Sequence, residues 1–265
     1  MNGRGDVCTA NIYSGCSRTA SSSNIINPIV SARLRTLSSF AFRYGRIEIR
    51  AKMPRGDWLW PAIWMLSRNW PYGPWPASGE IDIVESRGND DFGNLGNQYG
   101  GTTLHWGPFW PHNFFEKTHA EYAANVGSFA DDFHVWRLDW TKDKMEFYVD
   151  EVLQLTVDPG SSFWDFAGMD STYDNPWAAG SKMAPFDQKF YLILNVAAGG
   201  TNNFFPDDVA HKPWSNLSPT APLDFWEARS SPVLPSWQAG EDRISEGAAM
   251  QVDYVRVWKM ESAEQ

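Results

Sequence analysis

The fold of this chain is organised around one acidic stretch, Gly79-Glu80-Ile81-Asp82-Ile83-Val84-Glu85-Ser86-Arg87-Gly88-Asn89. Its β-branched residues favour a strand, and the glycines near its two ends favour turns. Because side chains alternate along a strand, Glu80 and Asp82 lie on one face. Glu85 comes five residues after Glu80 and would point to the opposite face of a regular strand. We therefore predict a β-bulge between Asp82 and Glu85, which returns all three acids to one face.

The rest of the chain indicates a single β domain. Its 265 residues include 15 Trp, 16 Phe and 9 Tyr, with many Gly and Pro residues to turn the chain between short strands. No internal repeat, domain linker or long helical pattern is evident. We predict one antiparallel β-sandwich over residues 32–260, preceded by an irregular leader over residues 1–31. Strands are expected at residues 33–37, 39–44, 45–53, 58–66, 80–86, 102–106, 133–140, 144–149, 152–157, 190–197 and 250–258.

Three long segments between these strands are expected to be irregular. Residues 107–121 are predicted to form a surface loop, residues 161–184 an insertion, and residues 199–240 a set of binding loops. A fourth loop, residues 69–79, is stiffened by prolines and carries Trp75 next to the acidic strand. The indole of Trp75 is well placed to hold a flat-faced ligand, although such a loop can also simply cover the core.

Charge and cysteine content limit the possible partners. A net charge of −10 disfavours nucleic acid and anionic membranes as partners, and leaves a neutral substrate as the simplest one. No apolar run approaches the ~20 residues that span a bilayer. Residues 1–23 lack the apolar segment of a signal peptide, so the chain is either not secreted or its leader lies outside this sequence. Cys8 and Cys16 could form a short-loop disulfide or remain two free thiols.

The three acids suggest glycoside hydrolysis. Like charges in one groove raise at least one pKa, so that a protonated acid lies beside an ionised one. A retaining glycosidase needs this pair at roughly 5 to 5.5 Å, and two Glu side chains leaning together can bridge Cα atoms roughly 13 Å apart along a strand. We assign Glu80 as nucleophile, Glu85 as acid/base and Asp82 as the group that tunes them.

The same residues allow other interpretations. A carboxylate metal site is weaker, because no nearby His or second carboxylate cluster completes a coordination shell. The acids could also lie on an ordinary solvated strand face. His105 could bind a sugar hydroxyl or one of the acids, or be an ordinary strand residue. The chain has no Gly-x-Ser-x-Gly elbow and no phosphate-binding glycine loop.

The Glu-x-Asp-x-x-Glu core of residues 79–89 resembles the signature of glycoside hydrolase family 16, in its bulged, laminarinase-like branch. The similarity covers residues 32–258, and the whole set of motifs looks like that of the endo-1,3-β-glucanases and β-1,3-glucan-binding proteins of invertebrates. It is carried by these further segments: Tyr44-Gly45-Arg46-Ile47-Glu48, Trp60-Pro61-Ala62-Ile63-Trp64, Leu104-His105-Trp106-Gly107-Pro108, Pro185-Phe186-Asp187, Asn195-Val196-Ala197-Ala198-Gly199-Gly200 and Val252-Asp253-Tyr254-Val255-Arg256-Val257.

The resemblance implies an all-β jelly-roll sandwich whose concave sheet holds a β-glucan polysaccharide or oligosaccharide. It implies an endo-acting, retaining hydrolase with the roles already assigned to the three acids, and a cleft lined by Trp60, Trp75, His105 and Trp106. No metal or cofactor is assigned. An extracellular monomer is expected.

The resemblance also allows a second function and shows one departure. Some relatives only recognise glucan in innate immunity, and these have often lost the acids that this chain retains.

Family members usually carry early strands before the segment that matches Ala32. Only the irregular leader, residues 1–31, stands in that place here, so we expect either a fragment or an isoform with an incomplete sandwich.

Overall fold

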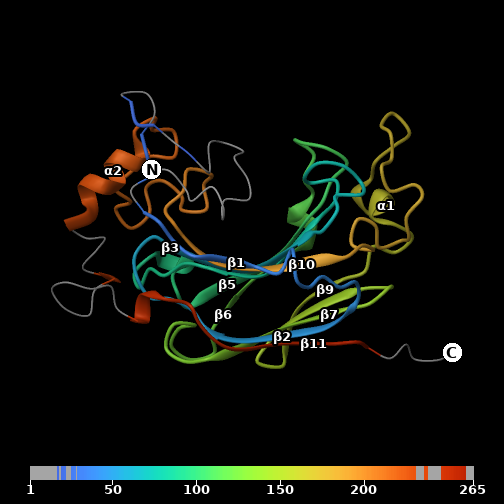
Figure 1. Ribbon diagram of the computed structural model, residues 1–265, viewed down its shortest axis with the longest axis horizontal. Coiled ribbons are helices and arrows are strands. Elements are labelled where there is room, and N and C mark those ends of the chain that lie inside the picture. Colours follow the sequence, from blue (N-terminus) through green and yellow to red (C-terminus); the bar gives the residue numbers. More distant parts are fainter. Residues whose placement is uncertain are drawn as a thin grey trace.

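The computed structural model of the chain is shown in Figure 1. It describes residues 17, 19–21, 25–27, 29–230, 236–237 and 246–260, except for the side chain of Asn94. Cys8 and Cys16 lie outside the described residues, so the disulfide stays a prediction. Within the described ranges, no helix is long and apolar enough to cross a membrane.

Two antiparallel sheets pack face to face, which confirms the predicted all-β sandwich. Their strand order is not sequential, as in a jelly roll. The first sheet has the order β1 (Arg33–Arg35), β10 (Phe190–Ala198), β3 (Leu59–Ser67), β4 (Glu80–Ser86), β5 (Tyr99–His105) and β6 (His119–Ala123). The second has the order β11 (Gln251–Trp258), β2 (Gly45–Lys52), β7 (His134–Trp140), β8 (Met145–Val149) and β9 (Val152–Val157).

The main core lies between the two sheets. Strand β2 shows how the sequence builds it, because its residues alternate between buried and half-buried along the whole strand. Ile47 and Ile49 point inward and meet large rings such as Trp136 and Trp140, all fully buried. A second, smaller cluster forms around Trp58, the residue immediately before β3.

The predicted bulge is present in β4. Against β3, Val84 pairs with Ile63 and Asp82 pairs with Trp64, so Ile83 is one residue more than β3 supplies. The register against β5 shifts at the same place, between Asp82 and Glu85. Ile83 and Val84 both point into the core, where each is nearly or fully buried.

The predicted strand at residues 39–44 is wrong. The carbonyl of Thr36 accepts hydrogen bonds from the backbone N–H groups of Ser39 and Phe40, which folds the segment into a turn. Only Phe42 then joins the sheet, through two backbone hydrogen bonds with Phe190.

The segments expected to be irregular contain short regular elements. Residues 107–121 include a 3₁₀ turn (Phe115–Thr118) and the start of β6. The insertion at 161–184 contains α1 (Phe163–Ala167), which begins at the Ser162 cap. The loops after β10 contain α2 (Ala221–Glu227) and a 3₁₀ turn (Ala228–Ser230); further 3₁₀ turns are Gly93–Leu95 and Glu246–Ala248. These elements are too short to show a hydrophobic period in the sequence.

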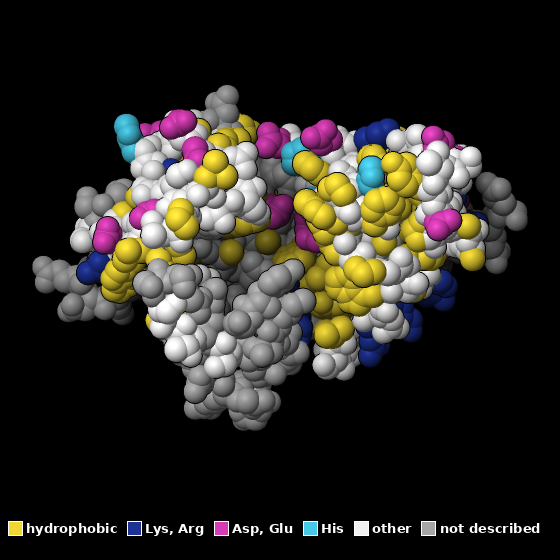
Figure 2. Space-filling model, turned by 90° about the horizontal axis from the view of Figure 1, so that it is seen from above, with side chains coloured by type: hydrophobic (Ala, Val, Ile, Leu, Met, Phe, Trp, Pro, Cys, Tyr) yellow, Lys and Arg dark blue, Asp and Glu magenta, His cyan; other side chains and the backbone are white. Residues whose placement is uncertain are grey.

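The residues of strand β10 are almost all apolar, which is typical of a strand buried on both faces, yet only its first half is buried in this way. Phe190–Ile193 are buried, whereas the following residues are half-buried. The second half leaves one face of the six-stranded sheet open to solvent. Figure 1 shows loops rising on both sides of that face, one group with α2 and the other with α1. Figure 2 shows a hollow on this face of the molecule, and the two groups of loops form the walls of this cleft.

The bulge generates a prediction about chain length. Deletion of Ile83 removes the extra residue and leaves Glu80, Asp82 and the former Glu85 at alternate positions of a regular strand. We expect this variant to fold with a loss of roughly 2–4 kcal/mol, the cost of one buried Ile side chain. Deletion of Ile81, equally buried, would turn Glu80 toward the core and should prevent folding. Urea unfolding measures both, and equal losses in the two variants would contradict the bulge assignment.

Candidate active site

Three acids lie on the open face of the six-stranded sheet. Glu80, Asp82 and Glu85 pair on β3 with Leu66, Trp64 and Ala62, and on β5 with His105, Thr103 and Gly101. Both sets of partners are alternate residues of their own strands, so all three acids share a face. Figure 2 shows acidic side chains at the bottom of a hollow that hydrophobic side chains flank.

Two indoles bind the two glutamates. Trp60 Nε1 donates to Glu85 Oε1 at 2.8 Å, and Trp75 Nε1 donates to Glu80 Oε2 at 2.7 Å. Trp60 comes from β3, whereas Trp75 comes from the proline-stiffened loop before β4. Each glutamate therefore has a donor fixed by a bulky, half-buried ring.

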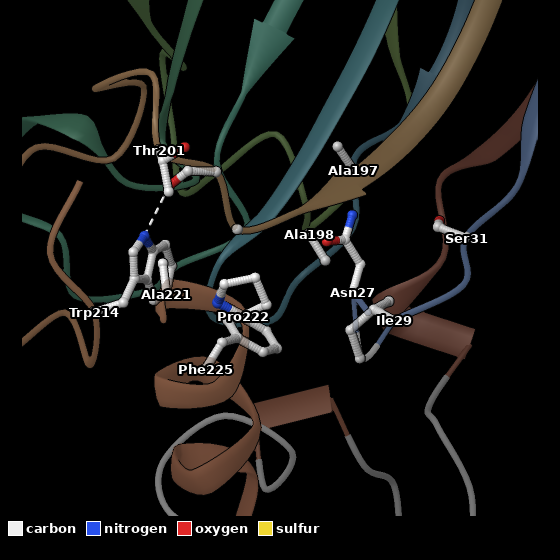
Figure 3. Close-up of a pocket in the computed structure, with 12 residues that line it drawn as sticks. Asn27, Ile29, Ser31, Ala197, Ala198, Thr201, Trp214, Ala221, Pro222 and Phe225 are labelled. Carbon is white, nitrogen blue, oxygen red and sulfur yellow. Dashed lines mark hydrogen bonds between the residues drawn. The ribbon is translucent and has the colours of Figure 1, made fainter. Parts of the chain in front are cut away.

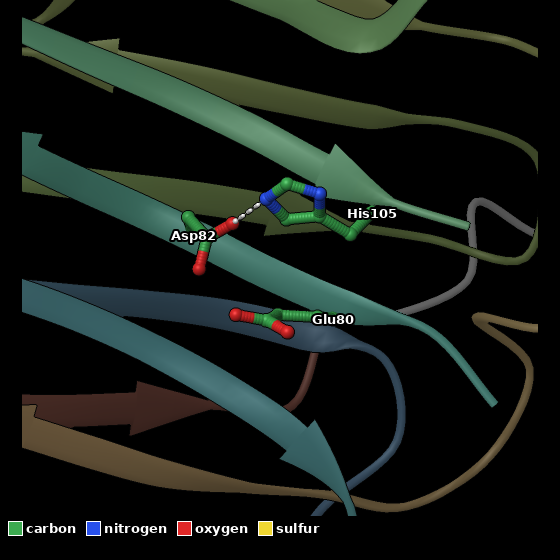
Figure 4. A group of neighbouring side chains, drawn as sticks. All are labelled: Glu80, Asp82 and His105. Atoms are coloured by element: carbon green, nitrogen blue, oxygen red, sulfur yellow. Dashed lines mark ion pairs between the residues drawn. The ribbon is translucent and has the colours of Figure 1, made fainter. Parts of the chain in front are cut away.

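His105 lies above the third acid. Its Nε2 is 3.3 Å from Oδ2 of Asp82, and Figure 4 shows the two side chains facing each other beside Glu80. Its Nδ1 is 2.8 Å from Nδ2 of Asn113. Asp82 also donates a hydrogen bond to Glu80 when it is protonated. Asp82 is thus hydrogen-bonded to Glu80 and lies against His105, whereas Glu85 acts on the other two acids through its charge.

Burial raises the pKa of all three acids. For Glu80 burial acts first and the charge of Glu85 second, and together they raise its pKa to about 7 against the hydrogen bonds from Trp75 and Asp82. Burial also raises the pKa of Asp82 and of Glu85, the latter against the Trp60 hydrogen bond. The same burial lowers the pKa of His105 to about 4, so that its ring is neutral near pH 7.

The prediction that no His lies near the acids is wrong. Ligand atoms of Glu80, Asp82 and His105 lie within 4.8 Å of one another. The surroundings still fit a cation poorly, because Trp75 directs an N–H at Glu80 and Asn113 fills Nδ1 of His105. The cluster is better suited to sharing protons than to holding a cation.

Trp106 does not line the cleft, contrary to the prediction. Its side chain is 0% exposed and packs in the main core against Phe163 and Phe166. Its Nε1 donates to Thr118 within the core. Because neighbouring residues of a strand point to opposite faces, His105 in the cleft places Trp106 in the core.

The structure adds aromatic residues that the sequence did not single out. On the α2 wall, Phe204 stacks on Trp60 with ring centroids 3.8 Å apart and an angle of 4° between the planes. Both Nε and Nη2 of Arg87 donate to the Phe204 carbonyl, and the guanidinium lies 4.0 Å from that ring. On the opposite wall the Trp110 side chain is 66% exposed, and its ring centroid lies 5.6 Å from that of Trp75. In the sequence, Trp110 is marked as a possible ligand contact only by its place in a loop rich in Pro and aromatic residues.

A cavity of about 390 Å³ lies beside the α2 wall. Figure 3 shows it between the end of β10, the α2 helix and the segment around Ile29. Trp214 contributes one side and donates from Nε1 to the carbonyl of Gly200 at 2.7 Å. This cavity is separate from the acids, which lie on β4.

The fold and the carboxyl cluster place the chain among two-sheet β proteins with acids in a concave sheet. The sequence model of Glycosyl hydrolases family 16 matches residues 16–187. The chain belongs to this family.

Several relatives support the assignment. The chain is 85% identical over its full length to a protein of Penaeus monodon named Beta-1,3-glucan-binding protein, of which it spans 72%. It is also 34% identical to Beta-1,3-glucan-binding protein 1 of Manduca sexta. That match covers 96% of this chain and 50% of the relative's length. It resembles the laminarinase catalytic domain of Thermotoga maritima, with a TM-score of 0.55, 27% identity and coverage of 87% of this chain and 69% of that one.

The raised pKa of Glu80 predicts a pH-dependent cost in stability. A carboxyl whose pKa is higher in the folded state destabilises the fold above that pKa, and the cost fades as the pH falls toward the unfolded value. Glu80→Gln should therefore stabilise the chain, by an amount that grows by on the order of 2 kcal/mol from pH 5 to pH 8.

Urea unfolding at the two pH values measures this difference. Glu48→Gln, at a half-buried position on the outer face of β2, is the matched control for removal of one negative charge. An advantage of Glu80→Gln that stays constant between pH 5 and 8 would contradict the raised pKa.

Proposed function

We propose that the chain is an endo-acting β-1,3-glucanase that works with retention of configuration. The observation that carries this proposal is the shared face of Glu80, Asp82 and Glu85 in an open cleft, with an indole donor on each glutamate. Two carboxyl groups of unequal protonation are the parts that glycoside hydrolysis requires. The laminarinase resemblance supports β-1,3-glucan as the substrate.

The reaction proceeds in two displacements. In the first, the Glu80 carboxylate attacks the anomeric carbon while Glu85 gives its proton to the glycosidic oxygen, so that the bond to the leaving chain breaks. In the second, the Glu85 carboxylate takes a proton from water, which attacks the same carbon and releases Glu80. Each displacement inverts the carbon, and the product retains the original configuration.

The hydrogen bonds favour this division of roles. Glu80 accepts from both Trp75 and protonated Asp82, and both interactions stabilise its carboxylate. Glu85 accepts one such hydrogen bond, from Trp60, while burial favours the protonated form of both glutamates, so the difference between them rests on the second donor to Glu80. Protonation of Glu85 removes the charge that raises the pKa of Glu80, so one proton on Glu85 leaves Glu80 ready to attack.

Aromatic rings are proposed to hold the sugar units. Trp60 and Phe204 form one side of the cleft, and Trp75 and Trp110 form the other. Pyranose rings present flat C–H faces that such rings can bind without charge. His105, from β5, is available to a hydroxyl of the sugar held at the acids.

A second function, glucan recognition without hydrolysis, is favoured by one observation. The relative from Penaeus monodon, 85% identical, is named for binding rather than cleavage. The same cleft would serve this function, with the acids accepting hydrogen bonds from sugar hydroxyls.

We further propose that residues 32–260 form one domain and that the chain acts as an extracellular monomer.

Substitution of the acids tests the enzyme. Glu80→Gln and Glu85→Gln should each reduce the release of reducing ends from laminarin by at least about a thousandfold, because each removes an essential group. Binding of laminarin, measured by calorimetry, should persist, since the rings that hold the sugar are unchanged. Glu48→Gln controls for loss of one negative charge. Wild-type protein that binds laminarin and releases no sugar would overturn the enzyme and leave the recognition function.

The anomeric outcome tests the role of Glu80. Proton NMR of the first-formed product should show the β-anomer, followed by slow mutarotation. An initial α-anomer would mean inversion and would exclude Glu80 as nucleophile.

A further inference from the structure

Asn113 binds the ring nitrogen of His105 that faces away from the acids. Its Nδ2 is 2.8 Å from His105 Nδ1, and its Oδ1 accepts from the backbone N–H of Trp106 at 3.3 Å. This Asn comes from the loop that connects β5 to β6, and it touches none of the three acids. It therefore acts on the site only through His105.

The backbone N–H of Trp106 fixes the orientation of the Asn113 amide. A backbone N–H can only donate, so the amide atom that faces it must be the oxygen. The NH₂ group is then the atom that faces His105. Because an NH₂ group is a donor, Nδ1 of the neutral ring must be its acceptor.

The loop that carries Asn113 is held closed at its base. Phe114 N–H donates to the carbonyl of Trp106 at 2.8 Å, next to the Asn113 contact. The carbonyl of His112 approaches Gly107 so closely that a Cβ there would lie 1.7 Å from its oxygen. Only glycine permits this approach, and the loop thereby holds Asn113 in place.

We propose that Asn113 is a positioning residue that sets the tautomer of His105, so that the ring proton resides on Nε2 and faces Asp82. The proposal deepens the hydrolase function and rests on it for its catalytic consequence.

The tautomer controls the proton of Asp82. With a proton on Nε2, the ring N–H faces the buried Oδ2 of Asp82, which lies 3.3 Å away and has no hydrogen-bond partner among the described residues, and the proton of Asp82 is left on its other oxygen for Glu80. With the opposite tautomer, Nε2 would accept the Asp82 proton and Glu80 would lose its donor. The titratable groups that face His105 are Asp82 and Glu80 on β4 and His119 on β6.

Nitrogen-15 NMR of the ring nitrogens tests the assignment directly. The chain has five His residues, and the spectrum of His105→Gln identifies the signals of His105. In the wild type, Nε2 should carry the proton and Nδ1 should be bare from pH 6 to 8. A wild-type ring with its proton on Nδ1, or with the proton shared equally, would overturn the proposal.

Two variants change the partner of Nδ1. In Asn113→Asp the new carboxylate accepts a hydrogen bond, so the proton should move to Nδ1. In Asn113→Ala the partner is lost and the two tautomers should mix. Asn69→Asp adds the same charge at an exposed position and should leave the His105 signals unchanged. An Asn113→Asp variant that folds like the wild type and keeps the proton on Nε2 would contradict the proposal.

Kinetics with laminarin separate positioning from a structural role. Asn113→Asp should lower kcat by about ten- to a hundredfold, with a smaller change in KM, and should shift the pH profile of kcat/KM. A merely structural role would lower kcat/KM equally at every pH. If the NMR result holds and no wild-type hydrolysis occurs, the hydrolase function fails while the tautomer assignment stands.

Discussion

Three carboxyl groups on one face of a central strand impose the main constraint on this molecule. Carboxylates withdrawn from water need hydrogen-bond donors or protons. Like charges in one groove also raise the free-energy cost of ionising each group. Two indole N–H groups supply donors, and the raised pKa of each acid favours its protonated form. The aromatic content of the cleft therefore serves the acids as well as a ligand.

The position of those donors follows from the sheet. Trp60 lies on β3 next to the acidic strand, while His105 lies directly opposite Glu80 on β5. Trp75 comes from the loop that leads into β4. The donors thus come from three separate segments that meet only after the sheet has formed. A folded sheet is needed before the three acids have their partners.

Much of this arrangement could be predicted from local sequence. The off-period spacing of Glu85 predicted the bulge, and alternation predicted most strands, because both depend on the side-chain period of a strand. The same rule, applied to His105 and its neighbour, would have placed Trp106 in the core. That residue was assigned to the cleft by resemblance alone, and the structure corrects the assignment.

The remaining features depend on contacts between distant segments. Phe204 meets Trp60 across more than a hundred residues of chain, and Asn113 reaches His105 through a loop whose shape rests on Gly107. The turn at residues 37–39 replaced an expected strand because one carbonyl accepted two local hydrogen bonds. No period in the sequence encodes contacts of this kind.

Arg87 connects the α2 wall to the acidic strand through side-chain contacts. It lies two residues after Glu85, and its guanidinium holds the carbonyl and the ring of Phe204. Phe204 in turn stacks on Trp60, whose N–H binds Glu85. The four residues close a ring of contacts that begins and ends on β4. Movement of Phe204 would therefore loosen contacts at both ends of this ring, one with Arg87 and one with Trp60.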